Sequence, residues 1–352
     1  MKVIGLMSGS SLDGVDLAYC SFEENNGKWQ YSIEAAHCYE FDDKIKNRLS
    51  NATSLSGREL MKLNADLGTY FGELIVRFKN DFLGTKNVDL IASHGHTIFH
   101  FPEEKFTTQI GDASHISAIT HLPVVADFRA KDVALGGNGA PVVPIGEKHL
   151  FADYSLFLNL GGIANISIHD GEKIIAFDVC AANQVLNFLA QQKGKAFDEN
   201  GEIAKKGTVN SILLDELNSI FYYQKSFPKS LDNSFSKELI LPILERYEIP
   251  IEDKLATYCE HIAIQLKNSL MLLQNQQASS LFITGGGAFN QYLISRIAAV
   301  CETKIEIPDA KIIAFKEALI IAFMGVLRVR GEVNILGSVT GANRDSVSGG
   351  LY

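Results

Sequence analysis

The 352-residue chain has few cysteines and no long apolar run. Its five cysteines are scattered and form no C-x-x-C pair, which favours free thiols in a reducing compartment over a disulfide framework. No stretch is apolar for long enough to span a bilayer. The apolar run after Lys2 is broken at Ser8, so no secretory signal is expected. These absences predict a soluble, cytoplasmic protein without a membrane partner.

Positive charge is also scarce, with 32 Lys plus Arg against 41 Asp plus Glu and a net charge of -9. Proteins that bind nucleic acid or anionic membranes concentrate positive charge, so we expect neither as a partner. An anionic small substrate is still possible, because a pocket needs only one or two local cations. The chain also lacks G-x-G-x-x-G and G-x-x-x-x-G-K-[ST], which excludes the usual dinucleotide fingerprint and the P-loop.

No linker rich in proline or serine interrupts the chain, which is long enough for two tightly joined domains. Helical periodicity, strongest from Leu255 to Leu273 and from Ala310 to Val329, separates short apolar runs. This alternation predicts an α/β fold with mixed sheets. The expected strands are Val3–Met7, Val15–Phe22, Val88–Ser93, Leu156–Leu160, Ile163–Ile168, Ile174–Asp178 and Leu281–Thr284.

Two glycine-rich hairpins suggest that the halves of the chain are similar. Residues 5–20 and 155–171 both have a strand, a glycine turn and a second strand. Glycine tips let backbone N–H groups approach an anion, and Asp13 in the first tip could orient Mg²⁺ or its waters. The alternative is that each tip is only a tight turn. We expect a first domain over residues 1–127, rejoined by 331–352, and a second over 128–330.

A third glycine site, Gly285-Gly286-Gly287, follows a buried strand and precedes a helix. Nucleotides commonly bind at the carboxyl ends of strands near such turns. Two glycine hairpins and a strand–GGG–helix fit a cleft in which two domains hold a nucleotide's phosphates from opposite sides. Such an arrangement suits phosphoryl transfer.

Several polar residues between the glycine sites are candidates for function. His94 and His96 have the spacing of metal ligands, but nothing completes a metal site, so a substrate contact or a structural role is expected. Arg129 follows a strand and could clamp a carboxylate or phosphate, or form a salt bridge with a nearby aspartate. Asp178 could be a general base or a helix N-terminal residue. Glu317, among apolar helical neighbours, must face solvent, a partner or a site.

Taken together, several segments resemble the anhydro-N-acetylmuramic acid kinase family. The family's first phosphate loop, G-[TS]-S-x-D-G-[VI]-D, matches residues 9–16. "SHGHT" resembles its H-G-Q-T, and "DFRAKDVALGGNGAP" its D-F-R-x-x-D-x-A-x-G-G-x-G-A-P. "NLGGIAN" resembles its second glycine loop, "FITGGGAFN" its nucleotide motif, and Glu317-Ala-Leu its E-A motif. The resemblance covers nearly the whole chain.

This resemblance implies two similar ribonuclease-H-like domains of the actin/sugar-kinase/heat-shock-protein type around a nucleotide cleft. It implies an enzyme that uses ATP, Mg²⁺ and water to convert 1,6-anhydro-N-acetylmuramic acid into N-acetylmuramic acid 6-phosphate, a step in recycling cell-wall fragments. Family members are often homodimers, so a homodimer is implied as well.

The resemblance also implies roles for individual residues. The catalytic residues would be Asp178 as the base, Arg129 and Glu317. Substrate contacts would come from His94, His96, Thr97, Arg129 and Asn183, and metal contacts through water from Asp13 and Asp16. The nucleotide would contact Gly9, Ser10, Ser11, Leu12, Asp13, Gly14, Val15, Asp16, Gly161, Gly162, Asn165, Gly285, Gly286, Gly287 and Asn290.

The chain departs from the family in two places. After Asp178 the family has T-G-P-G-N, whereas this chain has V-C-A-A-N, and His96 replaces a glutamine. The changes favour a lineage variant with the same activity. They could also mark a kinase for a different sugar, or a nucleotide-binding protein that has lost catalysis. Retention of Asp178, Arg129, Asp13 and Glu317 argues against a mere binder.

Overall fold

The computed structural model describes residues 1–9, 12–170, 173–227, 229–232, 234–271 and 280–352. The chain forms two compact units: the first comprises Met1–Ala152 and Phe315–Tyr352, and the second comprises Asp153–Ala314. Among the described residues, no helix combines the length and apolar character needed to cross a membrane.

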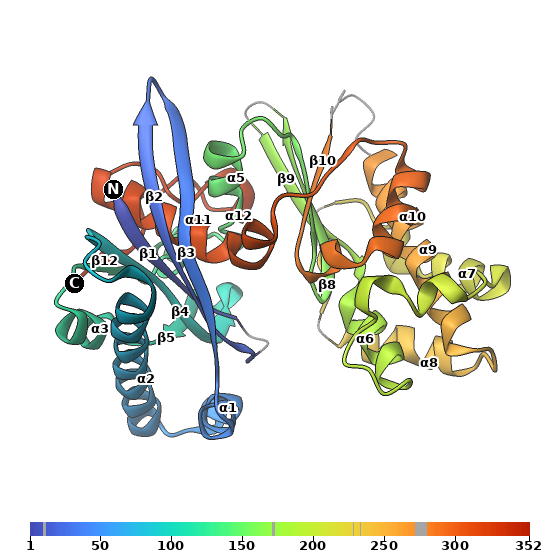
Figure 1. Ribbon diagram of the computed structural model, residues 1–352, viewed down its shortest axis with the longest axis horizontal. Coiled ribbons are helices and arrows are strands. Elements are labelled where there is room, and N and C mark those ends of the chain that lie inside the picture. The colour runs from blue at the N-terminus through green and yellow to red at the C-terminus, as the bar shows by residue number, and fades with distance from the viewer. Residues whose placement is uncertain (10–11, 171–172, 228, 233, 272–279) are drawn as a thin grey trace. The chain divides into compact units, whose positions relative to one another are not determined.

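The first unit is built on a mixed sheet with the strand order β12-β6-β4-β1-β2-β3, and β5 pairs with β4 (Figure 1). Strands β1, β2 and β3 are antiparallel neighbours, whereas β1, β4 and β6 are parallel. The strand bounds are β1 Lys2–Ser8, β2 Gly14–Asn25, β3 Lys28–Glu40, β4 Leu90–Phe101, β5 Phe106–Ile110, β6 Val124–Ala126 and β12 Gly350–Leu351.

The second unit repeats this pattern with the order β11-β10-β7-β8-β9. Here β7, β8 and β9 are antiparallel, and β7, β10 and β11 are parallel. The mixed sheets and the similarity of the two halves are therefore confirmed, and the two glycine hairpins occupy equivalent places. The strand bounds are β7 Leu156–Leu160, β8 Ile163–Asp170, β9 Lys173–Ala181, β10 Leu281–Thr284 and β11 Ile305–Glu306.

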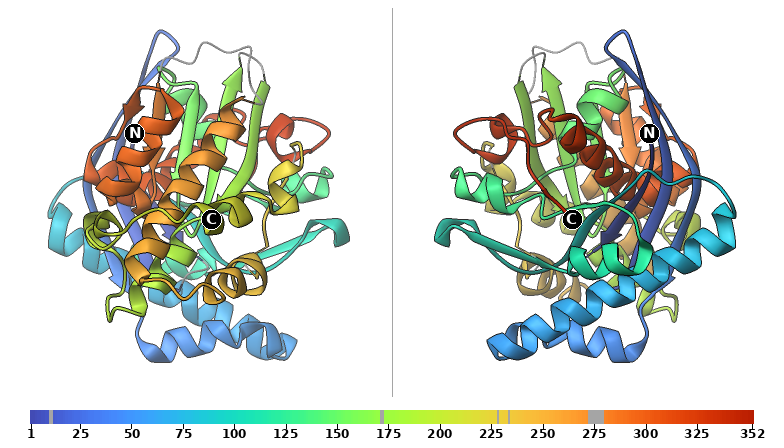
Figure 2. Two further views of the ribbon diagram at one scale, coloured as in Figure 1. Left: turned by 90° about the vertical axis from the view of Figure 1, so that its right-hand side faces the viewer. Right: turned by 90° about the vertical axis from the view of Figure 1, so that its left-hand side faces the viewer.

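Helices cover the sheet of each unit. In the first unit, α2 packs a buried row that includes Leu63, Leu67 and Phe71 on one face of the sheet. In the second, the helices gather on one face around the expected apolar stripe of α9 (Figures 1 and 2). Their bounds are α1 Asp43–Ser50, α2 Gly57–Phe78, α3 Ala113–Thr120, α4 Ala130–Ala134, α5 Pro144–Leu150, α6 Asn183–Gln191, α7 Ser211–Asn218, α8 Leu241–Glu245, α9 Ile251–Met271, α10 Gln291–Cys301, α11 Ala310–Arg330 and α12 Gly337–Thr340.

Helix α11 determines where the first unit resumes. It departs from helical dihedrals at Phe315 (φ −122°, ψ 17°) and then packs against β1. A Cβ on Gly5 would lie 1.9 Å from the Ala318 carbonyl oxygen, so only glycine permits this approach. The unit boundaries thus fall at 152/153 and 314/315, not at the expected 127/128 and 330/331. Helices α4, α5 and most of α11 belong to the first unit, and β12 returns to pair with β6.

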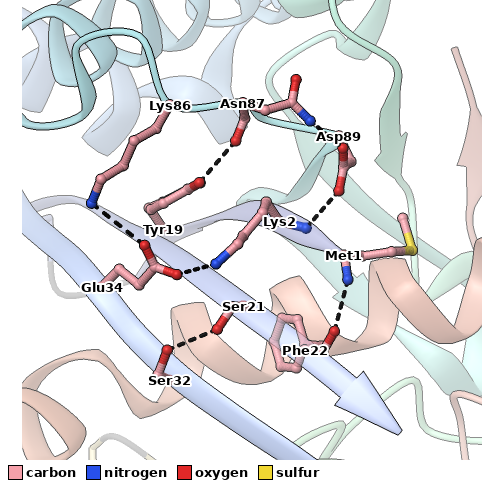
Figure 3. Close-up of polar contacts among 10 residues, drawn as sticks. All are labelled: Met1, Lys2, Tyr19, Ser21, Phe22, Ser32, Glu34, Lys86, Asn87 and Asp89. Atoms are coloured by element: carbon pink, nitrogen blue, oxygen red, sulfur yellow. Dashed lines mark hydrogen bonds and ion pairs between the residues drawn. The ribbon is translucent and has the colours of Figure 1, made fainter.

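A polar cluster holds the beginning of the chain against the first sheet (Figure 3). Glu34 accepts hydrogen bonds from Lys2 and Lys86, and the Tyr19 hydroxyl donates to the Asn87 carbonyl oxygen at 2.8 Å. The Lys2 hydrogen bond is the main cause that holds the pKa of Glu34 below its usual range. The cluster joins β1, β2 and β3 to the segment that leads into β4.

A buried ion pair joins α5 to α11 and leads to a prediction on stability. Lys316 Nζ lies 3.1 Å from Glu147 Oε1, and the two side chains are 7% and 4% exposed. Lys316→Met leaves the carboxylate buried without this ammonium group, so we expect unfolding free energy to fall by about 3–5 kcal/mol. Urea denaturation measures the loss. The control Lys304→Met breaks the solvent-exposed pair with Glu306 and should leave the unfolding free energy nearly unchanged. Equal losses of unfolding free energy in the two variants would contradict the claim that the buried Lys316–Glu147 pair stabilises the fold.

Candidate active site

A row of polar residues crosses the sheet of the second unit. Thr284 of β10 pairs with Asn159 of β7, Asn159 with Asn165 of β8, and Asn165 with Asp178 of β9. Directly paired residues project from the same face of a sheet. Their apolar neighbours Leu158 and Ile283 belong to the core, so the polar row lies on the other face. The proposed base therefore shares this face with the ends of the strands that lead into both glycine turns.

Asp178 is held by a segment distant in sequence. Its Oδ2 accepts a hydrogen bond from the Leu231 amide at 2.9 Å, and its carbonyl oxygen accepts one from the Tyr222 hydroxyl at 2.7 Å. Its own amide donates to the Lys229 carbonyl oxygen at 3.2 Å. Burial raises the pKa of Asp178, and the Leu231 hydrogen bond partly opposes that rise. A positioned carboxylate with a raised pKa is suited to accept a proton.

The turn after β10 approaches the end of β7 closely. Gly285 has φ +81°, and a Cβ there would lie 2.6 Å from Asn159 Oδ1. A Cβ on Gly287 would lie 2.7 Å from Leu160 Cβ, so both positions need glycine. Beside them, the hydroxyl oxygen of Thr284 is buried and has no hydrogen-bond partner among the described residues. A turn of this kind, followed by α10, fits the phosphates of a nucleotide.

Two asparagines named from the sequence have protein partners in the second unit. Asn183 donates through Nδ2 to the Leu160 carbonyl oxygen at 2.9 Å. Its Oδ1 lies 3.2 Å from the position a Cβ on Gly287 would take, so Asn183 accompanies the glycine turn named for the nucleotide. Asn290 caps α10 by accepting from the Leu293 amide at 3.0 Å. This N-cap hydrogen bond is a structural role for Asn290 that does not require a nucleotide contact.

The segment that departs from the family motif is part of the core. Val179, Cys180, Ala181 and Ala182 are at most 1% exposed. The amides of Ala182 and Gln184 donate to the Gly162 carbonyl oxygen at 2.8 and 3.2 Å, and that of Asn183 to Gly161. The altered side chains therefore fill the core beneath the second glycine hairpin, and the backbone tie between the hairpin and α6 does not depend on them.

The first glycine loop is described only in part, because Ser10 and Ser11 lie outside the described residues. Leu12 has φ 61°, and its amide donates to the Gly9 carbonyl oxygen at 3.3 Å. Val15 is fully buried in the core, so its side chain has no access to a nucleotide. Gly14 is buried as well, whereas Asp13 is exposed and Leu12 and Asp16 are partly exposed.

Asp13 and Asp16 are the carboxylates named for a metal. Asp13 is exposed, and Asp16 lies opposite Cys38 in the β2–β3 ladder. Burial raises the pKa of Asp16, the Cys38 thiol opposes the rise by hydrogen bonding, and the Asp13 charge adds to it. In the part of the chain that the structure describes, no three or more His, Cys, Asp or Glu side chains converge as metal ligands. Two carboxylates fit Mg²⁺ that keeps several waters.

His94, Arg129 and Glu317 interact electrostatically within the first unit. Burial lowers the pKa of His94 to about 3, and the Arg129 charge contributes. The Glu317 residue has solvent-exposed area. Desolvation of its carboxyl group by the protein packed around it raises its pKa; the charges of Lys316 and Arg129 oppose the rise, and that of Asp16 adds to it. No ion pair joins Arg129 to Asp127 or Asp132 among the described residues, so the alternative of a salt bridge that shapes the loop does not hold.

The "SHGHT" segment lies within a strand and not at its end. Strand β4 continues to Phe101 and pairs with β5, which the sequence did not predict. His96 shares a hydrogen bond of 2.9 Å between its Nδ1 and the Ser8 hydroxyl. The Thr97 hydroxyl accepts from Gln109 Nε2 at 3.3 Å. Burial lowers the pKa of His96, so its ring favours the neutral form in place of the family's uncharged glutamine.

Comparison with known proteins identifies the family. The family model described as anhydro-N-acetylmuramic acid kinase matches residues 1–352. The chain belongs to this family. A protein of Photobacterium profundum with the family's name is 34% identical over 316 residues, covering 85% of this chain and 83% of that protein. One of Vibrio cholerae is 33% identical, covering 99% and 97%. The resemblance inferred from the motifs is confirmed.

A solved structure supports the fold. Glycerol kinase of Plasmodium falciparum, solved with ADP, has a TM-score of 0.50 and 11% identity, with 93% of this chain and 90% of that chain covered. At this identity the likeness concerns the fold alone, and it agrees with the mixed α/β fold that the sequence predicted.

Within the anhydro-N-acetylmuramic acid kinase framework, the structure adds residues that sequence reasoning missed. Tyr222 and Leu231 hold Asp178, Thr284 and Asn159 extend its polar row, and Gln109 joins the histidine segment. Their partners lie far away in sequence or in an adjacent strand. Strand register would have revealed Thr284, Asn159 and Gln109, whereas Tyr222 and Leu231 lie outside the strands and carry no sequence signal.

Proposed function

We propose that the protein is an ATP-dependent kinase that opens 1,6-anhydro-N-acetylmuramic acid with water and phosphorylates O6. The products are N-acetylmuramic acid 6-phosphate and ADP. The observation that carries the proposal is the match of the family model over the entire chain. The polar row that contains Asp178 and the glycine turns beside it support it.

The chemistry assigns one proton transfer to Asp178. Water attacks C1 of the sugar, and the bond between C1 and O6 breaks. O6 takes the γ-phosphoryl group of ATP, and the water's proton passes to the Asp178 carboxylate. A general base of this kind contributes about 10²–10⁴ to the rate. The Leu231 amide and the Tyr222 hydroxyl keep Asp178 in one orientation for that transfer.

Arg129 and Glu317 bind the sugar in this proposal. The Arg129 guanidinium supplies donors to the sugar's oxygens, and its Nε is buried without a hydrogen-bond partner among the described residues. Glu317, an exposed residue of α11, would accept hydrogen bonds from the sugar's hydroxyl groups. His94, His96 and Thr97 contribute from β4, and Asn183 supports the glycine turn of the second unit.

ATP and Mg²⁺ are assigned to the glycine loops. The phosphates would be held by Gly9–Asp16 in the first unit and by Gly161, Gly162 and Gly285–Gly287 in the second. Asp13 and Asp16 would hold Mg²⁺ through its waters. The bound ion neutralises phosphate charge during transfer.

The pKa of Asp178 predicts the acid side of the pH profile. The base acts as the carboxylate, and burial raises its pKa above the ordinary 3.8. We therefore expect kcat to fall as pH decreases, with the midpoint of the fall at a pH above 3.8. At pH values well above the pKa of Asp178, kcat should reach its maximum. Initial rates at saturating substrates, with circular dichroism to verify folding at each pH, measure the midpoint. A kcat that stays constant below pH 3.8 in the folded protein would contradict the role of Asp178.

A substrate panel tests the proposal. The protein is incubated with MgATP and 1,6-anhydro-N-acetylmuramic acid, N-acetylmuramic acid or N-acetylglucosamine, and ADP and sugar phosphate are measured together. We expect equal amounts of ADP and N-acetylmuramic acid 6-phosphate from the anhydro sugar. Phosphorylation of another sugar alone would indicate a kinase of different specificity, and ATP binding without product would indicate a binding protein.

A further inference from the structure

His94 presents an unused hydrogen-bond acceptor. Its Nδ1 lies 3.1 Å from the Gly95 carbonyl oxygen, and because a carbonyl oxygen only accepts, Nδ1 must carry the proton. The ring is neutral, so Nε2 has a lone pair and no proton. That atom is buried and has no hydrogen-bond partner among the described residues. A buried acceptor of this kind is costly unless a ligand or water supplies a donor.

Gln109 on the neighbouring strand presents a second acceptor. The Thr107 hydroxyl donates to the Phe99 carbonyl oxygen, so its oxygen must accept from Gln109, at 2.8 Å. This places the amide nitrogen toward Thr107 and Thr97 and fixes which side-chain atom is the oxygen. The oxygen, Oε1, is likewise buried without a hydrogen-bond partner in the described part of the chain.

Gly95 brings the backbone next to His94 close to Gln109 on the neighbouring strand. It has φ +73°, and a Cβ there would lie 2.7 Å from the Ile110 carbonyl oxygen and 3.3 Å from Gln109 Cβ. The side chain of Gln109 therefore lies against the residue that follows His94. Arg129, which interacts electrostatically with His94, adds a buried donor at Nε.

The sugar of the proposed function has a matching set of groups. In 1,6-anhydro-N-acetylmuramic acid, O1 and O6 form the bridge and O3 carries the lactyl ether, whose acid is ionised at neutral pH. Its remaining hydrogen-bond donors are the hydroxyl at C4 and the acetamido N–H. We propose that His94 Nε2 and Gln109 Oε1 accept these two donors and so determine specificity for the sugar. This inference rests on the proposed function.

Substrate analogues that each lack one donor test the pairing. One is the 4-deoxy sugar, and the other has an acetoxy group in place of the acetamido group at C2. With the wild-type protein we expect each analogue to lower kcat/KM by about tenfold or more, because an acceptor is left unpaired. In His94→Phe, kcat/KM for one of the two analogues should be less than about threefold below that for the parent sugar, because the acceptor for the missing donor is gone. In Gln109→Met the same should hold for the other analogue. Which analogue pairs with which variant assigns the contacts.

Matched variants separate the contact from effects on folding. Gln109→Glu keeps an acceptor oxygen but loses the donor to Thr107 and Thr97, so kcat/KM for the parent sugar should fall while the discrimination between parent sugar and analogues is retained. His37→Phe changes an exposed histidine on β3 and should behave as wild type. If His94→Phe does not fold, ¹⁵N NMR of histidine in the wild-type protein replaces it. We expect a neutral ring protonated at Nδ1, whose Nε2 signal shifts when the parent sugar binds.

The outcomes distinguish this inference from the proposed function. Wild-type protein that does not turn over the parent sugar would refute the proposed function itself. If the wild-type protein turns over the parent sugar, and a variant shows the same fall in kcat/KM from parent sugar to each analogue as the wild type, the residue changed in that variant does not accept either donor. An Nε2 that carries the proton, or that does not respond to the sugar, would overturn the role of His94.

Discussion

Asp178→Asn is expected to lower kcat by about 10³-fold or more while the affinity for ATP changes by less than about twofold. Asparagine has nearly the same shape and can still accept the Leu231 hydrogen bond through its amide oxygen. It cannot take a proton from water, so the attack on C1 loses its base. Single-turnover rates measure the chemical step, and titration with a non-hydrolysable ATP analogue measures nucleotide binding.

Asp215→Asn is the matched control. Asp215 is exposed on α7 in the same unit, and its replacement should leave both quantities unchanged. A kcat for Asp178→Asn within about tenfold of wild type would show that another group activates the water. A parallel loss of ATP affinity would instead show that Asp178 supports the nucleotide turn.

Arg129→Ala is expected to raise the KM for the sugar by about 10- to 100-fold, the value of one or two charged hydrogen bonds, with little change in ATP affinity. Arg129 is the N-cap residue of α4, in which Asp132 accepts from the Gly139 amide and the Thr340 hydroxyl, each at 2.8 Å. These bonds hold the loop without the Arg129 side chain. Separate binding titrations with the sugar and with ATP measure the two effects.

Arg129→Lys is the companion variant, since it keeps the charge but loses the planar fork and should recover only part of the sugar affinity. Equal losses of sugar and ATP affinity in Arg129→Ala would place the residue in the nucleotide site. A large drop in thermal stability with normal affinities would give it a role in folding alone.

The sequence predicted the central strands of both sheets because each is an apolar run bounded by glycine or polar turns. It missed β3 and β5, whose residues are mostly exposed or only partly buried, and the two-residue strands β11 and β12. The unit boundaries were misplaced because α11 reads as one continuous apolar helix. The change at Phe315 and the contact of Ala318 with Gly5 depend on tertiary packing.

For the site, motifs named Asp178, Arg129 and the glycine turns, but not how they are held. Asp178 depends on Tyr222 and Leu231, which lie 44 and 53 residues away, and no local pattern marks either of them. Spacing also could not show that Val15 faces the core. That side of β2 is set by its pairing with β1 and β3.

The most direct test of the proposed reaction is turnover of 1,6-anhydro-N-acetylmuramic acid with MgATP in ¹⁸O-labelled water, with the product analysed by mass spectrometry. Coupled ring opening and phosphoryl transfer predicts N-acetylmuramic acid 6-phosphate with one heavy oxygen at C1 and none in the phosphate. The label at C1 is read early, before exchange with water at the free anomeric centre. A heavy oxygen in the phosphate, or ADP formed without sugar phosphate, would contradict the account.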